Sequence, residues 1–151
     1  MLSLTDSISA AFLETSEQLL RAGISVRFRA GGQSMHPTIR DGETITVEPV
    51  APGIIRCGDI VLYRSRNGII AHRVVRIERR GAALVFTPRG DGMPASDAPI
   101  AAAEVLGRVV MVERDQRRIH LTGIKARWMR RMRRAATLLK ARMKSSAPFS
   151  L

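Results

Sequence analysis

The 151-residue sequence has a single cysteine, few aromatic side chains and no long apolar run. One cysteine cannot form an internal disulfide, so nothing indicates an oxidising compartment, and we expect Cys57 to be a small buried residue. No cysteine and histidine residues have the spacing of metal ligands, and we expect no cofactor. No stretch approaches the ~20 apolar residues that a membrane-spanning helix needs.

A secretory signal is also missing. Residues 1–23 contain Asp6, Glu14 and Glu17 instead of a basic start followed by an apolar segment. We therefore expect a cytoplasmic protein, with peripheral association with a membrane as the alternative. The mean hydropathy of -0.02 and the apolar content of 45% are typical of a globular chain, and the length suits one domain with tails.

The net charge of +12 is concentrated near the end of the chain. Residues 124–144 hold nine of the 25 lysine and arginine residues and none of the 13 acidic ones. The same segment has an apolar stripe at helical spacing, made of Trp128, Met132, Ala136, Leu139 and Met143. This composition predicts a basic amphipathic helix. The stripe favours an anionic membrane surface or a protein partner over nucleic acid, and a solvated tail without a partner stays an alternative.

The rest of the chain changes from a helical to a strand pattern near Gly23. Residues 6–22 predict a short amphipathic helix, capped by Asp6 or Ser7 and ended by Gly23. Strands are predicted over residues 25–29, 44–47, 59–63, 69–77, 83–86, 105–112 and 119–121. Asn67-Gly68 predicts a two-residue hairpin, and residues 88–99, with three prolines, predict a loop.

Many short strands without a long central helix indicate a mainly β fold, either a barrel or a coiled antiparallel sheet. We expect three parts: an N-terminal amphipathic helix over residues 1–23, a β domain over residues 24–123, and the basic C-terminal tail over residues 124–151.

The stretch GGQSMHPTIRD, residues 31–41, places Ser34 in a bend between glycines and a proline. Gly31 and Gly32 permit unusual dihedral angles just before the serine, and Pro37 fixes the exit from the bend. Such a hydroxyl either caps a turn or is a nucleophile held up to solvent.

A nucleophilic serine needs a base that accepts its proton. Lysine is excluded from the body, because all three lysines lie in the basic tail. Of the three histidines, His36 is too close to Ser34 to be oriented independently, and we expect His120 to be exposed on a terminal strand. His72 lies in a largely β-branched run, where a lone histidine needs a reason. The alternative is that His72 has only a structural role, as a hydrogen-bonded histidine on a half-exposed strand face.

Six short motifs follow one another along the body of the chain. They are Ser34-Met35-x-Pro37-Thr38-Ile39, Asp41-Gly42, Cys57-Gly58-Asp59-Ile60-Val61, Ala71-His72-Arg73-Val74-Val75, Thr87-x-x-Gly90-Asp91 with Asp97 after it, and Val105-x-Gly107-Arg108-Val109-Val110. In this order they resemble the signal peptidase I family of the S24/S26 superfamily. The resemblance is to the endoplasmic-reticulum and archaeal-like branch, in which histidine replaces lysine as the base.

The resemblance implies a coiled antiparallel β fold and a serine endopeptidase that forms an acyl-enzyme on Ser34. His72 would take the hydroxyl proton and return it to the leaving amine. Asp97 would orient the imidazole, with Asp91 as support or as the alternative third member. The N–H of Ser34 would help to form the oxyanion hole. Gly32 stands where the lysine-type branch often has a serine hydroxyl. Met35 would lie near the substrate groove or fill the core.

Family members usually begin with a transmembrane anchor, whereas this sequence has only the amphipathic stretch from Asp6 to Arg21 at that place. We therefore expect a dedicated peptide or protein substrate inside the cell. Two alternatives stay open. One is a catalytically inactive peptide-binding module of the same fold. The other is a regulatory protein like the self-cleaving repressors, which use lysine as base and carry an N-terminal helix-turn-helix.

Overall fold

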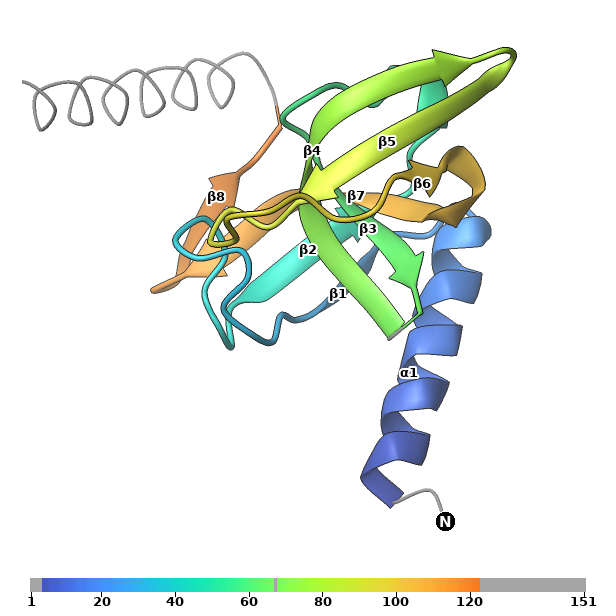
Figure 1. Ribbon diagram of the computed structural model, residues 1–151. Helices are drawn as coiled ribbons and strands as arrows, with labels where there is room; N and C mark the ends of the chain where they lie inside the picture. Colours follow the sequence, from blue (N-terminus) through green and yellow to red (C-terminus); the bar gives the residue numbers. More distant parts are fainter. Residues whose placement is uncertain (1–3, 67, 123–151) are drawn as a thin grey trace, which may run out of the picture. The chain divides into compact units, whose positions relative to one another are not determined.

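A computed structural model describes residues 4–66 and 68–122 of the chain (Figure 1). The chain divides into two compact units, Met1–Leu121 and Thr122–Leu151, and the first unit holds every helix and strand that the structure describes. The predicted basic helix over residues 124–151 lies outside the described residues. The mainly β fold is confirmed, because the first unit is one antiparallel sheet of eight strands with a helix before it.

The elements follow the predicted order with modest shifts at their ends. They are α1 (Leu4–Arg21), β1 (Val26–Arg29), β2 (Thr44–Glu48), β3 (Ile60–Ser65), β4 (Gly68–Arg80), β5 (Ala83–Arg89), β6 (Ile100–Ala101), β7 (Val105–Arg114) and β8 (Arg117–His120). Two single-turn 3₁₀ helices, Pro52–Ile54 and Ala102–Glu104, were not predicted.

The end of α1 agrees with the sequence pattern. Gly23 has φ +82°, a left-handed conformation that favours glycine. Its N–H donates to the Leu20 carbonyl, and the Ile24 N–H donates to the Leu19 carbonyl. These two hydrogen bonds form a Schellman motif, which provides donors for carbonyl groups that would otherwise lack a partner at the helix end.

The prediction that the loop begins at residue 88 was wrong, because β5 continues to Arg89. Pro88 lies within β5, opposite Val74 of β4, where the register between the two strands is irregular. A proline has no N–H to donate, so a strand tolerates it best where regular pairing is interrupted. Its carbonyl accepts a hydrogen bond from the Asp97 N–H at 2.8 Å. The loop is thereby tied back to the strand at its far end.

The strands pair in the order β1-β2-β7-β3-β4-β5-β6, with β8 beside β7. The sheet is not closed into a barrel. β4 pairs with β3 from Gly68 to Arg73, but with β5 only from Arg73 onward. The first residues of β4 therefore have a second edge that no described strand occupies. The strands β3 and β4 form a hairpin with Ser65 opposite Gly68, while Asn67 itself lies outside the described residues.

Two groups of buried apolar side chains lie along the sheet. One extends from α1 and the Ser34 bend through β2, β3 and β7, and includes Leu20, Met35, Ile39, Leu62 and Val109. The other lies beneath β3, β4 and β5, around Tyr63, Val74 and Phe86. The first group supports the bend that carries Ser34, and the second supports the strand that carries His72.

Cys57 is exposed, which corrects the expectation that it is buried. It occupies the turn before β3, next to Gly58 with φ +96°. The turn directs the side chain away from the sheet. Among the described residues, no helix is long and apolar enough to cross a membrane.

Helix α1 is attached to the sheet by contacts near its C-terminal end. Leu20 is 2% exposed, and a Cβ at Gly107 of β7 would lie only 3.3 Å from its Cδ2 atom. Glu17 is buried and pairs with Arg21 and with Arg64 of β3. The charged pair and the leucine together fix where the helix lies relative to the sheet.

We expect Leu20→Ala to lower the free energy of unfolding by about 2–4 kcal/mol, because it removes buried methyl groups and leaves a cavity. Leu19→Ala is the matched control, since Leu19 is 37% exposed, and it is expected to cost less than about 1 kcal/mol. Urea unfolding followed by circular dichroism measures both. Equal losses in the two variants would contradict the docking of α1 through Leu20.

Candidate active site

Ser34 lies in a compact turn whose neighbours are anchored in the core. Met35 and Ile39 are buried, and the Ile39 N–H donates to the Met35 carbonyl at 3.0 Å. Before the serine, Gly32 has φ +91°, and its N–H donates to the Asp41 carboxylate at 2.8 Å. The bend is therefore held at both ends, while the Ser34 side chain between them stays half-buried and accessible.

His72 lies in β4, and its ring reaches the hydroxyl of Ser34. It is opposite Val61 of β3 and is 6% exposed. Its Nε2 atom is 2.9 Å from the Ser34 hydroxyl oxygen. The two residues are 38 positions apart in the chain, so only the fold brings them together. The other two histidines, His36 and His120, are exposed.

Asp97 meets the other nitrogen of the same ring. Its Oδ2 atom is 2.5 Å from His72 Nδ1. A carboxylate at this place accepts a hydrogen bond from Nδ1–H. The ring proton then stays on Nδ1, and Nε2 is free to accept the hydroxyl proton of Ser34. The three side chains thus form one continuous line of hydrogen bonds, from carboxylate to imidazole to hydroxyl.

Tyr63 is a member of this group that sequence reasoning missed. Its hydroxyl donates to Asp97 Oδ2 at 2.8 Å, the same oxygen that meets the imidazole. Burial, with the hydrogen bond to the Asp97 carboxylate, raises the pKa of Tyr63 well above its ordinary value. The hydroxyl therefore remains a proton donor over the whole working pH range. The available signal was that Tyr63 is the one tyrosine of the chain and ends an apolar strand segment.

Asp91 lies in a different network. Its two carboxylate oxygens accept hydrogen bonds from Nε and Nη2 of Arg73 at 2.7 and 2.5 Å, and Thr38 donates to Oδ2 at 2.5 Å. Arg73 also donates to the Gly58 carbonyl at 2.7 Å. Asp97 therefore contacts the ring, while Asp91 ties the loop after β5 to β4 and to the turn of Ser34.

Gly90 and Gly92 bring that loop against the serine backbone. A Cβ atom at Gly90 would lie 2.5 Å from the Ser34 carbonyl oxygen and 3.1 Å from His72 Nε2, so no larger residue fits without displacement. The Gly92 N–H donates to the same carbonyl at 2.9 Å. The loop after β5 therefore closes one side of the Ser34–His72 pair.

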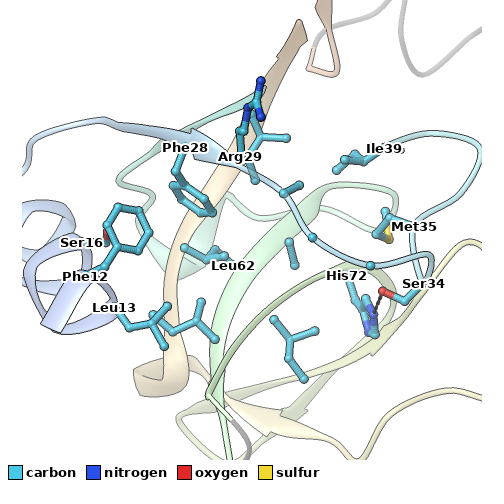
Figure 2. Close-up of a pocket in the computed structure, with 17 residues that line it drawn as sticks. Phe12, Leu13, Ser16, Phe28, Arg29, Ser34, Met35, Ile39, Leu62 and His72 are labelled. Atoms are coloured by element: carbon cyan, nitrogen blue, oxygen red, sulfur yellow. Dashed lines mark hydrogen bonds between the residues drawn. The ribbon is translucent and has the colours of Figure 1, made fainter. Parts of the chain in front are cut away.

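A cleft of about 460 Å³ opens on the other side of the pair. Figure 2 shows Ser34 and His72 at one end and the side chains of α1 at the opposite end. One wall of the cleft is the end of β1 and the residues that follow it up to Gly32. The other wall is the first residues of β4, and Leu62 and Ile45 line the cleft between the two walls. Met35 lines this cleft and is buried, which confirms that it fills the core; its place near a substrate groove stays a prediction.

The described residues contain no group of three His, Cys, Asp or Glu side chains that could hold a metal ion. The groups that the structure brings together at the site are a hydroxyl, an imidazole and a carboxylate.

We expect Asp91→Ala to lower the free energy of unfolding by about 3 kcal/mol, because Arg73 is 7% exposed and would keep an unpaired buried charge. Glu78→Ala is the matched control. It breaks ion pairs with Arg76 and Arg80, whose side chains are 70% and 63% exposed, and such pairs contribute at most about 1 kcal/mol. Thermal and urea unfolding would compare the two, and similar losses would contradict a structural role for Asp91.

Comparison with known proteins agrees with this arrangement at the level of the family. The sequence model of the Peptidase S24-like family matches residues 5–110, which include Ser34, His72, Asp91 and Asp97. No curated protein sequence matches the chain. The family comprises serine-peptidase-type domains and also includes self-cleaving repressors, so membership indicates the type of domain rather than one activity. Since the match extends over more than half of the sequence, the chain belongs to the peptidase S24-like family.

Proposed function

We propose that the protein is a serine endopeptidase in which Ser34 is the nucleophile, His72 the general base and Asp97 the residue that orients it. The observation that carries the proposal is the line of hydrogen bonds from Asp97 through His72 to Ser34, at 2.5 and 2.9 Å. The 2.9 Å between His72 Nε2 and the Ser34 oxygen is within the range at which a base can accept a proton from a nucleophile.

In the first step the Ser34 oxygen attacks the carbonyl carbon of the scissile peptide bond, and its proton moves to His72 Nε2. The tetrahedral intermediate collapses when the imidazolium gives that proton to the leaving amine, which leaves an ester on Ser34. A water molecule then attacks the ester and gives a proton to His72, and the imidazolium returns that proton to the Ser34 oxygen as the acid leaves. Asp97 stabilises the imidazolium that forms in both halves of the reaction.

The negative oxygen of the intermediate needs donors close by. In the described part of the chain the Ser34 N–H donates to no acceptor, so it is available to that oxygen. Gly32 supplies no side-chain donor, which agrees with the expectation from the sequence.

An extended peptide suits the cleft because the cleft has strand edges on both sides. Among the described strands, β1 pairs only with β2, and β4 before Arg73 pairs only with β3. A peptide between them could form backbone hydrogen bonds to both, the mode of recognition known as β-strand addition. The open side of the sheet thereby becomes the place of the substrate.

The use of histidine as base supports a relation to the histidine-type signal peptidases within the superfamily. The three lysines of the chain all lie in residues 124–144, outside the described residues, whereas the repressors resembling this fold use lysine. The described residues before β1 form one helix, α1, and not a helix-turn-helix. A repressor-like role is therefore the weaker alternative. A partner for the basic tail stays a prediction.

The proposal predicts that a fluorophosphonate probe modifies Ser34 covalently, which mass spectrometry of the digested protein detects. Ser34→Ala should abolish labelling and His72→Ala should slow it by at least about 10³-fold, because loss of one member of such a triad costs this much or more. Asp97→Asn should slow labelling more than Asp91→Asn, because Asp97 contacts the imidazole directly, whereas Asp91 acts on the site only through Arg73 and Thr38.

Circular dichroism must show that each of these variants is folded. Wild-type protein that binds peptides in the cleft but is never labelled would indicate the catalytically inactive binding module instead.

Tyr63→Phe should slow the labelling of Ser34 by roughly tenfold, since the loss of one hydrogen bond to a charged group costs about 1–2 kcal/mol. The aromatic ring remains, so the core should stay intact. In NMR spectra the Nδ1 proton of His72 should exchange faster with water, because Asp97 is less well held. An unchanged rate together with an unchanged Nδ1 signal would contradict a positioning role for Tyr63.

A further inference from the structure

The cleft beside Ser34 is closed at its far end by helix α1. Phe12, Leu13 and Ser16 of α1 line this end, and Figure 2 shows them opposite the Ser34–His72 pair. We call Phe12 and Leu13 the α1 wall. Residues of α1 are not needed for the bond-breaking steps, so their presence in the cleft requires another explanation.

The α1 wall is held in place against the strands. The rings of Phe12 and Phe28 of β1 meet edge to face, with centroids 5.6 Å apart and an angle of 79°. One turn further along the helix, Glu17 pairs with Arg64 of β3. The helix thus contacts β1, which forms one wall of the cleft, and β3, which lies between the two walls, so a ligand would meet a fixed surface there.

The distance from the reacting pair to the α1 wall can be expressed in peptide residues. A Cβ atom at Gly68 would lie 3.7 Å from Leu13 Cδ1, so Leu13 is next to the start of β4. Gly68 precedes His72 by four residues along the strand, or ~13 Å at the usual strand rise. An extended peptide beside β4 would therefore reach Leu13 about four residues from the bond at Ser34.

The chemistry of this end of the cleft is apolar. Among the described residues that line the cleft none is acidic, and Arg29, which is exposed, is the one permanently charged side chain. Phe12 is 48% exposed and Leu13 is half-buried, so both offer apolar surface that a ligand can cover. Covering such surface is favourable by about 25 cal/mol per Å².

We infer that the α1 wall is a specificity site, which selects substrates with a large apolar side chain about four residues from the scissile bond. The inference rests on the proposed peptidase function, and it concerns one flank of the bond, the flank that extends along β4 toward α1. Leucine, methionine or phenylalanine at that position would pack against Leu13 and Phe12. A lysine or arginine side chain would lose water there without gaining a partner, because none of the described residues that line the cleft is acidic.

The test compares wild-type protein with Leu13→Asp on a defined mixture of synthetic peptides in which every position samples all amino-acid types. Mass spectrometry of the products gives the cleavage preference at each position. In the wild type, large apolar residues should be enriched about four residues from the cleaved bond on one flank. Leu13→Asp should weaken this preference by at least about tenfold and favour lysine or arginine at the same position.

Leu19→Asp is the matched control, because it places the same charge on the same helix, outside the cleft and on an exposed residue. Its cleavage preferences should equal those of the wild type. Wild-type cleavage with no preference at that position, or with a preference that Leu13→Asp leaves unchanged, would overturn the inference while leaving the peptidase proposal intact.

A binding measurement separates this inference from the proposed reaction. Dodecylphosphonate, which lacks a leaving group, should bind the cleft and shift the NMR signals of the Phe12 and Phe28 rings. Leu13→Asp should weaken this binding at least about tenfold, and Leu19→Asp should not. Should wild type cleave no peptide and resist the fluorophosphonate probe, the reaction proposal fails. Weaker binding of dodecylphosphonate to Leu13→Asp than to wild type would then still support the apolar site. Equal binding to the two proteins would overturn it.

Discussion

The arrangement around Ser34 depends on the buried ion pair between Arg73 and Asp91. Arg73 follows His72 directly in β4, so whatever holds its guanidinium group also fixes the strand next to the imidazole. The Asp91 carboxylate meets that group with both oxygens and accepts a third hydrogen bond from Thr38, in the turn of Ser34. One carboxylate therefore links the loop after β5, strand β4 and the turn of Ser34. Two aspartates in one loop consequently have different tasks: Asp91 positions the backbone and Asp97 meets the ring.

The backbone of the loop after β5 also packs closely against Ser34 and His72. Gly90 lies so near the Ser34 carbonyl and the His72 ring that a side chain has no room, and the Gly92 N–H is bonded to that carbonyl. The side of the serine toward this loop is thus filled, while the opposite side opens into the apolar cleft. The two open strand edges of the described residues border that cleft. This one-sided geometry connects the proposed reaction with the specificity proposed for the α1 wall.

Much of the fold could be predicted because its signals are local. The Gly23 helix end, the strand runs and the hairpin before β4 follow from dihedral preferences and from alternation of apolar residues, which act over a few positions. The short strand β6, the 3₁₀ turns and the continuation of β5 through Pro88 were missed. The pairing of β6 and of Pro88 depends on a partner strand elsewhere in the chain, such as Val74 opposite Pro88. Cys57 was misjudged for the same reason, since the turn that exposes it is set by its neighbours in space.

The sequence by itself determined which side chains were available for chemistry: one serine in a glycine-proline bend, no lysine in the body, one histidine in the middle of a largely β-branched run, and two aspartates in a loop. It could not decide between Asp91 and Asp97, because both lie in the same loop, and spacing says nothing about which one faces the imidazole. Tertiary structure made that choice by pairing Asp91 with Arg73 and placing Tyr63 behind Asp97. It also brought α1 to the end of the cleft, through contacts with β1, β3 and β7 that no local pattern encodes. Hydrogen bonds and packing between distant segments form only when the chain is folded, so these features belong to the structure alone.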